Sequence, residues 1–281
     1  MPSLKEKRRG INIFQQLLKQ LGTKMNIDFG RLIINDSRPL VFILSGAGLS
    51  AESGIPTFRG KDGLWKNWYP SEIASDTALK ERPEDVFEFY NFRIGKAVDC
   101  LPNAAHTSIA QFQQAVKDYC DVVHVTQNVD NLNELAGSPS VFHLHGDFQS
   151  SLCSQCKNTF PRLSLYKKNN VCPVCGASGY SVRPNVVLFG EMPYGLDWIT
   201  SYLKKACVFM SVGTSGAVYP AANFVLDTEA AIRINFDIET GKRRNASFTH
   251  EITGPCSQTL PPVLGALKEE LSSRFKEQKN K

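Results

Sequence analysis

A chain of 281 residues with 42% hydrophobic side chains is long enough for one large or two ordinary globular domains. No apolar run approaches the roughly 20 residues that a membrane span needs, and no signal-peptide pattern opens the chain. The net charge of +5 lies in the first 24 residues, which hold six basic side chains and one acidic one. The remaining residues have no net charge, so we predict no specific nucleic-acid partner. We also predict no membrane span.

Residues 1–35 are predicted to be a basic N-terminal extension. Their apolar residues recur at helical spacing: Ile11, Phe14, Leu17, Leu18 and Leu21. This pattern fits a solvated, partly helical tail; a targeting sequence is an alternative that the low serine content weakens, and a basic arm for nucleic acid or membrane is a third. The predicted localisation is cytoplasmic, or mitochondrial if the extension is a targeting sequence.

The first core strand is expected at Val41–Ser45, and a glycine-rich run follows it. The order Gly46-x-Gly48-x-x-Ala51 matches the dinucleotide-binding fingerprint. In that reading Gly46 permits a tight turn, Gly48 admits a pyrophosphate and Ala51 lets a helix pack on the sheet. The run continues through Ile55-Pro56-Thr57-Phe58-Arg59, which an ordinary dehydrogenase does not need.

Residues 61–120 contain no clear core strand and are expected to form helices and loops at the ligand edge of the sheet. A dinucleotide site that transfers hydride has an acid about 20 residues after the glycines, at the end of a second strand. Here Asp62 and Glu72 fall in a loop-rich segment. The sequence therefore favours a site that uses NAD as a substrate.

Pro83 to Ala97 is predicted to be a helix that places Tyr90 and Arg93 on one face. A guanidinium can hold a carboxylate in two hydrogen bonds, and a phenol can add a third. The alternative is an arginine in a surface salt bridge and a tyrosine packed on the core.

Further strands are expected at 122–126, 141–144, 186–189, 208–212 and 232–236, with helical or mixed segments between most of them. This alternation predicts an α/β fold with a Rossmann-like, doubly wound parallel sheet. The expected core comprises residues 36–60, 121–150 and 183–268. Residues 269–281 are expected to be a charged C-terminal tail or frayed helix.

The segment 151–182 is predicted to be a small inserted zinc-ribbon module. Its cysteines have the spacing C-x2-C-x15-C-x2-C, at Cys153, Cys156, Cys172 and Cys175. Two such pairs can complete a tetrahedral site without an open position, so the predicted zinc is structural. An iron–sulfur cluster or four unligated cysteines are the alternatives. The four other cysteines are scattered, which favours a reducing compartment over a disulfide framework.

Polar residues follow two predicted strands: Gln127, Asn128 and Asp130 after the second, and His145 after the third. A neutral imidazole can accept a proton at physiological pH. A lone histidine is more often structural, and such polar residues after a strand often serve turns or caps.

Five blocks of the chain resemble the sirtuins, which are NAD-dependent protein-lysine deacylases. In order, they are Gly46–Arg59, Thr126–Asp130, His143–Gly146, the four cysteines and Gly213–Ser215. The resemblance covers roughly residues 36–267 and implies an enzyme that acts on acyl-lysine proteins or peptides. We also expect a monomer. In the family reaction, the acyl oxygen attacks the nicotinamide ribose and nicotinamide leaves; a ribose hydroxyl then attacks the imidate carbon, and water releases lysine and O-acyl-ADP-ribose.

The resemblance also implies residue roles. His145 would be the catalytic base. The implied NAD-binding residues are Gly46, Ala47, Gly48, Ala51, Ile55, Pro56, Thr57, Phe58, Arg59, Trp65, Gln127, Asn128, Asp130, Gly213, Thr214, Ser215, Asp237, Glu239 and Cys256. Asp237 stands where the family commonly has asparagine, and aspartate can accept but not donate.

Tyr90 and Arg93 resemble the signature of sirtuins that remove succinyl, malonyl and glutaryl groups, and weak deacetylation is also expected. The implied substrate residues are Ala74, Tyr90, Arg93, Val187, Phe189, Gly190 and Glu191. Ala74 would leave room for a long acyl chain, and the segment 187–191 would pair with the substrate backbone as an added strand. The competing interpretations are a mono-ADP-ribosyltransferase on the same scaffold and a non-catalytic zinc-ribbon module that binds a nucleotide.

Overall fold

The computed structural model describes residues 27–34, 38–57, 70–216, 218–239 and 247–279. Its main element is a six-stranded parallel sheet in the order β3-β2-β1-β7-β8-β9. The strands are β1 (Leu40–Ser45), β2 (Asp121–Thr126), β3 (Phe142–His143), β7 (Val208–Val212), β8 (Ile232–Asp237) and β9 (His250–Thr253). The sheet confirms the predicted Rossmann-like fold class. The sequence reasoning missed β9, a four-residue edge strand.

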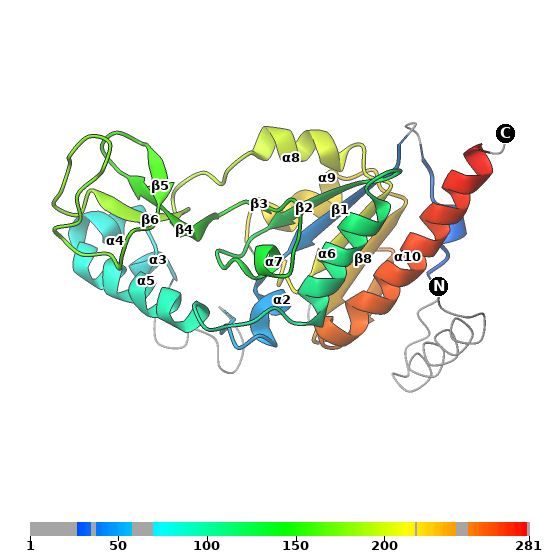
Figure 1. The fold of residues 1–281 in the computed structure, drawn as a ribbon, viewed down its shortest axis with the longest axis horizontal. Coiled ribbons are helices and arrows are strands. Elements are labelled where there is room, and N and C mark those ends of the chain that lie inside the picture. The colour runs from blue at the N-terminus through cyan, green and yellow to red at the C-terminus, as the bar shows by residue number, and fades with distance from the viewer. Residues whose placement is uncertain (1–26, 35–37, 58–69, 217, 240–246, 280–281) are drawn as a thin grey trace.

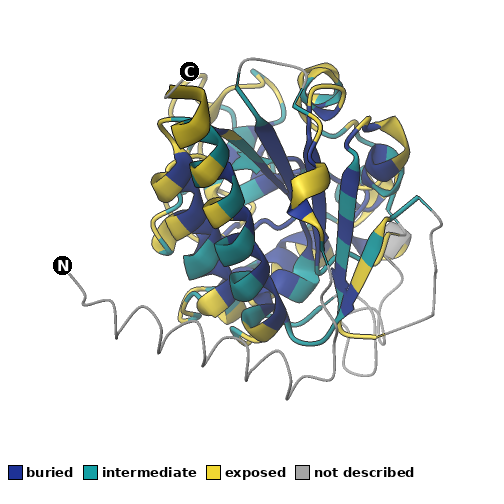
Figure 2. Ribbon diagram, turned by 90° about the vertical axis from the view of Figure 1, so that its right-hand side faces the viewer, coloured by how far each residue is buried: buried dark blue, intermediate teal, exposed yellow. Residues whose placement is uncertain are grey.

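Helices cover both faces of the sheet (Figure 1). One face packs on α6 (Ala104–Val116) and α10 (Cys256–Lys279), and the other on α8 (Leu196–Leu203) and α9 (Phe224–Asp227). The central strand β1 is buried throughout, and its side chains alternate between these two cores. Figure 2 shows the buried strands enclosed by half-exposed helices. The short element η1 (Phe29–Arg31) precedes β1, and the connections contain α2 (Ala47–Ala51), α7 (Leu132–Leu135) and η3 (Ala221–Asn223).

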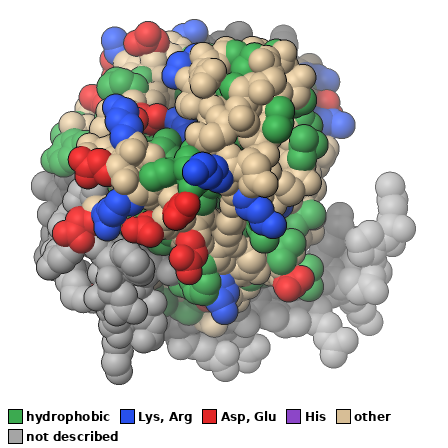
Figure 3. Space-filling model, turned by 90° about the vertical axis from the view of Figure 1, so that its left-hand side faces the viewer, with side chains coloured by type: hydrophobic (Ala, Val, Ile, Leu, Met, Phe, Trp, Pro, Cys, Tyr) green, Lys and Arg blue, Asp and Glu red, His purple; other side chains and the backbone are tan. Residues whose placement is uncertain are grey.

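A smaller unit lies at one end of the molecule (Figure 1). Its antiparallel sheet has the order β5-β4-β6, formed by β4 (Gly146–Cys153), β5 (Thr159–Pro161) and β6 (Val182–Val186). It packs against α3 (Pro70–Ile73), α4 (Asp76–Glu81) and α5 (Pro83–Ala97) around a core of its own. Basic and acidic side chains are interspersed on its outer face (Figure 3).

The small unit is larger than the expected module of residues 151–182. The run 186–189 was expected to be a strand of the main sheet, but Val186 ends β6 in the small sheet. Likewise β4 starts at Gly146, so residues 146–150 belong to the small sheet and not to the parallel core. The reason is pairing: β4 and β6 run antiparallel to each other, and an apolar run alone does not reveal its partner.

The two chain ends also differ from expectation. Residues 269–279 are not a tail, because α10 continues through them with Leu271 buried in the core. The guanidinium of Arg274 donates to the carbonyls of Phe29, Gly30 and Leu32. Phe29 and Leu32 are buried, so the end of the expected N-terminal extension packs on the main unit. Within the described residues, no helix has the length and apolar character of a membrane span.

Candidate functional site: a pocket at the sheet edge and a four-cysteine cluster

The loops that follow β1 and β7 touch at the carboxyl edge of the main sheet. Gly46 N donates to Val212 O at 3.0 Å, and Gly48 N donates to Gly213 O at 2.8 Å. A Cβ atom on Gly48 would lie 2.7 Å from Gly213 Cα, closer than real Cβ contacts. Gly213 itself has φ of +61°, in the left-handed region that favours glycine. The second fingerprint glycine is therefore required by contact between two loops, in addition to any role toward a pyrophosphate.

The third fingerprint position does not have the expected packing role. α2 is only five residues long, and Ala51 at its end is exposed. Ser50, one residue earlier, is buried and lies in the pocket. Among the described residues of this connection, the helix that follows the glycines does not pack on the sheet through Ala51.

Ser50, Asn128 and Asp130 form a buried hydrogen-bond network. Ser50 Oγ donates to Asp130 Oδ2 at 3.0 Å. Asn128 Nδ2 donates to Ser50 Oγ at 3.1 Å and to Gly46 O at 3.0 Å. Burial raises the pKa of Asp130, although hydrogen bonds from Leu132 N and Ser50 oppose the shift. The network fixes Asn128 and Asp130, which follow β2, against the glycine-rich loop.

His145 is held as a neutral base. Its Nδ1 lies 3.1 Å from Gln127 O, and a carbonyl only accepts, so Nδ1 carries the proton. In the neutral ring Nε2 then has the lone pair, and it makes no hydrogen bond to another described residue. Burial lowers the pKa of His145, partly opposed by the Gln127 carbonyl. The imidazole is therefore in the base form at physiological pH.

His143 has a different state. Its Nδ1 lies 2.9 Å from Asn128 O and its Nε2 lies 2.7 Å from a Glu134 carboxylate oxygen, so both nitrogens donate. Burial alone would lower its pKa, but the hydrogen bond and charge of Glu134 outweigh it and the pKa is raised. A ring with both nitrogens engaged is a poor base, which distinguishes it from His145.

Gly146, directly after His145, starts β4. Its φ is +75°, and a Cβ atom there would lie 1.9 Å from Asn185 O. The carbonyl of His145 accepts from Val187 N at 2.9 Å. The histidine therefore sits where the main sheet ends and the small unit begins, and only glycine fits after it.

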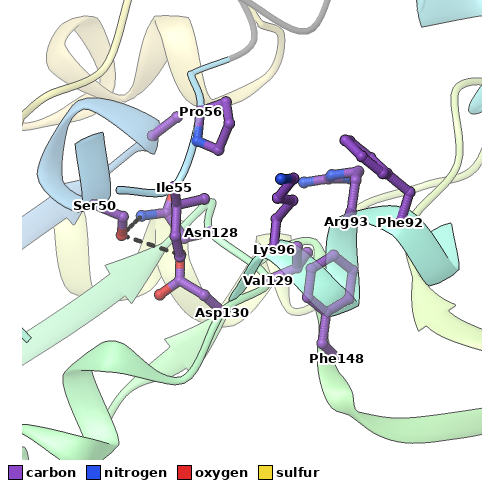
Figure 4. Close-up of a pocket in the computed structure, with 11 residues that line it drawn as sticks. Ser50, Ile55, Pro56, Phe92, Arg93, Lys96, Asn128, Val129, Asp130 and Phe148 are labelled. Carbon is purple, nitrogen blue, oxygen red and sulfur yellow. Dashed lines mark hydrogen bonds between the residues drawn. The ribbon is translucent and has the colours of Figure 1, made fainter. Parts of the chain in front are cut away.

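A pocket near these residues has two unlike walls (Figure 4). One wall contains Ser50, Asn128, Asp130, Ile55 and Pro56. The other is formed by α5 and β4, which carry Arg93, Lys96, Phe92 and Phe148, together with Val129 from the segment after β2. Ala47 completes the lining.

Arg93 is half-buried among aromatic rings. Its guanidinium carbon lies 5.1 Å from the ring centroid of Phe148, 5.6 Å from that of Phe89 and 5.7 Å from that of Tyr90. Tyr90 is buried behind Arg93 and does not line the pocket. Burial raises the pKa of Tyr90 to about 12, so its phenol keeps its proton. Arg93 lines the pocket, and its guanidinium lies over the ring of Tyr90.

The segment after β6 has mixed roles. Phe189 N donates to Ala74 O at 2.8 Å, and Asp76 N donates to Phe189 O at 3.2 Å, so Phe189 pairs with the chain before α4. Glu191, expected to contact substrate, instead accepts from Arg183 at 2.5 Å and from Leu188 N at 2.9 Å. The carbonyl of Val187 and the N–H of Gly190 make no hydrogen bond to other described residues. Ala74 is buried beside Tyr90 in the small core and does not line the pocket.

The remaining predicted NAD residues have varied positions. Thr214, Asp237 and Cys256 lie along the carboxyl edge near β7 and β8. Burial raises the pKa of the Cys256 thiol to about 12, and the negative charges of Glu52 and Asp237 add to this shift. Ser215 and Glu239 are exposed, and Gln127 and Thr57 are half-buried. Phe58, Arg59 and Trp65 lie outside the described residues.

The four predicted metal ligands meet at one end of the small sheet. Their sulfur atoms all lie within 4.8 Å of one another, with Cys153–Cys175 at 3.7 Å and Cys156–Cys172 at 3.8 Å. Each pair lies in a tight turn: Lys157 N donates to Cys153 O, and Gly176 N donates to Cys172 O. Four thiolates with no other donor suit a tetrahedral structural zinc ion.

Sequence reasoning missed Ser50, Phe92, Lys96, Val129 and Phe148 as pocket residues. Ser50 had a usable signal, a small polar residue inside the fingerprint. Phe92 and Lys96 are close to Arg93 on the same helix, and helical spacing could have suggested them. Val129 stands between two predicted residues, and Phe148 reaches the pocket only through the pairing of β4.

Comparisons with known proteins agree with this geometry. Residues 46–220 match the model of the Sir2 family. An NAD-dependent protein deacylase of Caulobacter vibrioides is 40% identical over 223 residues, which cover 79% of this chain and 93% of the relative. The NAD-dependent protein deacylase SIR2rp3 of Leishmania major is 40% identical over 237 residues, covering 82% and 97%. A crystal structure of a Sir2 homologue with NAD has a TM-score of 0.72 and 33% identity, covering 89% of this chain and 95% of that one.

The fold and site define an NAD-binding α/β protein with an accessory structural zinc module. The chain belongs to the Sir2 family.

Proposed function

We propose that this protein is an NAD-dependent protein-lysine deacylase that prefers acyl groups ending in a carboxylate, such as succinyl, malonyl and glutaryl, and acts weakly on acetyl-lysine. The activity of the relatives named above supports the deacylase reaction. The observation that carries the acyl preference is Arg93, a cation in the wall of the pocket that also contains Asn128 and Asp130.

Each residue has a chemical task in this proposal. The loop Gly46–Pro56 and the side chains of Asn128 and Asp130 would hold NAD, which supplies the ribose carbon that accepts the acyl oxygen. His145 Nε2 would take a proton from a ribose hydroxyl, since Nδ1 is committed to Gln127 O. The Val187 carbonyl and the Gly190 N–H, which make no hydrogen bond within the described part of the chain, would pair with the backbone of the acyl-lysine peptide.

The surroundings of Arg93 support its role toward a carboxylate. Aromatic rings hold its guanidinium in place, so little side-chain freedom is lost on binding. Hydrogen bonds to a charged group contribute about 1.5–3 kcal/mol, which corresponds to roughly 10- to 150-fold in affinity. An acetyl group has no carboxylate and cannot form them.

Turnover of one peptide sequence carrying acetyl-, butyryl-, malonyl-, succinyl- or glutaryl-lysine tests the proposal. We expect a higher kcat/KM for the acidic acyl groups. Arg93→Met should lower the ratio of succinyl to acetyl kcat/KM by about 10-fold or more. Arg82→Met, on an exposed arginine at the start of the same helix, is the matched control. Equal losses on both acyl classes would contradict the preference.

We also propose a monomeric enzyme of a reducing compartment, the cytoplasm. All eight cysteines are free, and four of them form the metal cluster. Size-exclusion chromatography with light scattering and fractionation of the source cells test the two points separately.

A further inference from the structure

Lys96 is a second cation on the wall that carries Arg93. It lies one helical turn further along α5, about 4.5 Å along the helix axis, and lines the same pocket. In Figure 4 the side chains of Arg93 and Lys96 extend beside each other into the gap, toward the wall that contains Asn128 and Ile55.

Lys96 is held at the edge of the pocket by another lining residue, Phe92. Lys96 Nζ lies 5.5 Å from the ring centroid of Phe92, four residues earlier on the helix. Such cation–π contacts at exposed sites contribute about 0.5–1 kcal/mol. Phe92 also lines the pocket although its side chain is about half exposed. The ring therefore supports the ammonium group over the pocket mouth.

Among the described lining residues of the pocket, two are cationic, Arg93 and Lys96, and one is acidic, Asp130, whose charge attracts Arg93. Ser50 Oγ and Leu132 N already donate to the carboxylate of Asp130. Within the described chain, Lys96 forms no ion pair with an acidic side chain. Two cations one turn apart repel each other, and an anion placed between them removes that repulsion. The arrangement favours a ligand with a negative group at its end.

We propose that Lys96 is a specificity-determining residue that recognises the terminal carboxylate of the acyl group together with Arg93. The inference rests on the proposed acyl preference and adds a second contact to it. Arg93, half-buried among rings, makes the directed contact. Lys96, exposed at the rim, adds an attraction that salt screens, because exposed charges are surrounded by water and ions.

Lys96→Gln tests this with kinetics and binding. The substrates are succinyl- and butyryl-lysine on one peptide sequence, which have four-carbon acyl chains with and without a carboxylate. We expect the ratio of succinyl to butyryl kcat/KM to fall about two- to fivefold, mainly through KM, and Lys96→Glu to lower it further. Anisotropy of fluorescein-labelled peptides should show the same change in the ratio of Kd values. The wild-type succinyl preference should decline between about 50 and 500 mM NaCl more steeply than that of Lys96→Gln.

Lys268→Gln is the matched control, an exposed lysine on α10 with the same change in net charge. It should leave the ratio unaltered, and thermal melting should show that all variants fold. If Arg93→Met removes the succinyl preference but Lys96→Gln leaves the ratio and its salt dependence unaltered, the role of Lys96 is wrong and the proposed function stands. If the wild type has no preference for succinyl-lysine, the proposed function fails and the role of Lys96 fails with it.

Discussion

The two walls of the pocket come from units that are stabilised in different ways. The wall with Ser50, Asn128 and Asp130 belongs to the parallel sheet, whose central strand is buried on both faces. The wall with Arg93 and Phe148 belongs to the small unit, whose core includes Cys153 and Cys172 of the metal cluster. The first wall is fixed by a large apolar core, and the second depends on a core that is linked to metal binding.

This difference assigns separate tasks to the walls. The sheet wall contains the side-chain network around Asn128, and its residues follow strands whose positions are set by the ladder. The small unit contributes the cations, which lie on one face of a helix. Changes on the sheet wall should therefore affect catalysis on every acyl group, while changes on the helix should affect the choice between acyl groups. Four predictions test or refine this division.

The largest effect is expected at His145, where the two units meet. His145→Ala should lower kcat/KM about 100- to 10,000-fold on acidic and neutral acyl groups alike, because a positioned base is lost. NAD binding, measured by calorimetry, should stay within a few fold. Since burial lowers the pKa of His145, the wild-type rate should rise with pH through a value below 6.5.

A histidine elsewhere provides the control for this substitution. His250→Ala, on the edge strand β9, should leave turnover near the wild-type level. Near-normal turnover of His145→Ala would mean that another group is the base. His143 would then be the first residue to test, and Nε2 of His145 would have no catalytic task.

The second prediction concerns the zinc ion of the small unit. Replacing Cys153 and Cys156 by serine should reduce the zinc content from one per chain to none. Hydrogen exchange should accelerate in β4–β6 and α5 and change little in β1 and β7, because the two cores are distinct clusters. Cys100→Ser, outside the cluster, is the control, and zinc retained by the double variant would disprove the assignment.

The sequence predicted the parts of the site that are contiguous in the chain. The glycine-rich loop, the residues after β2, His145 and the cysteine pairs each form a local motif whose chemistry shows in its spacing. Pairing between distant segments was not predictable in the same way. The run 186–189 has the composition of a strand, but its place in the small sheet depends on β4. Glu191 looks like a substrate residue in sequence, and only the fold shows that Arg183 occupies its carboxylate.

The third prediction separates two parts of the N-terminal extension. Deleting residues 1–26 should leave deacylation within a few fold, because they contain no predicted site residue. Deleting residues 1–33 also removes Phe29 and Leu32, whose burial contributes about 1.5–3 kcal/mol each to the free energy of unfolding. A cut at residue 30 would fall inside this packed segment. Urea unfolding of both deletions measures the difference.

If the shorter deletion unfolds as easily as the longer one, the apolar stripe of residues 11–21 contributes to the fold. If the longer deletion is as stable as the full chain, the contacts of Arg274 with the backbone of residues 29–32 have no energetic role.

The smallest effect is expected at the ion pair of Glu134 and His143. His143 also bonds the backbone of Asn128 in the sheet wall. The folded-state pKa of His143 is raised above its usual value of about 6.5, so the pair stabilises the fold fully below that pH and loses its effect as pH rises through the folded pKa. Because Glu134 is about 42% exposed, solvent screening limits the contribution to about 0.2–1 kcal/mol. Glu134→Gln should therefore lower the unfolding free energy at pH 6 and have little effect at pH 8.5, and NMR titration should show a lower His143 pKa.

Glu81→Gln, at an exposed acid on α4, controls for the change in net charge. A loss that is equal at both pH values would mean that Glu134 stabilises the fold without the charge of His143, and that this histidine is neutral like His145.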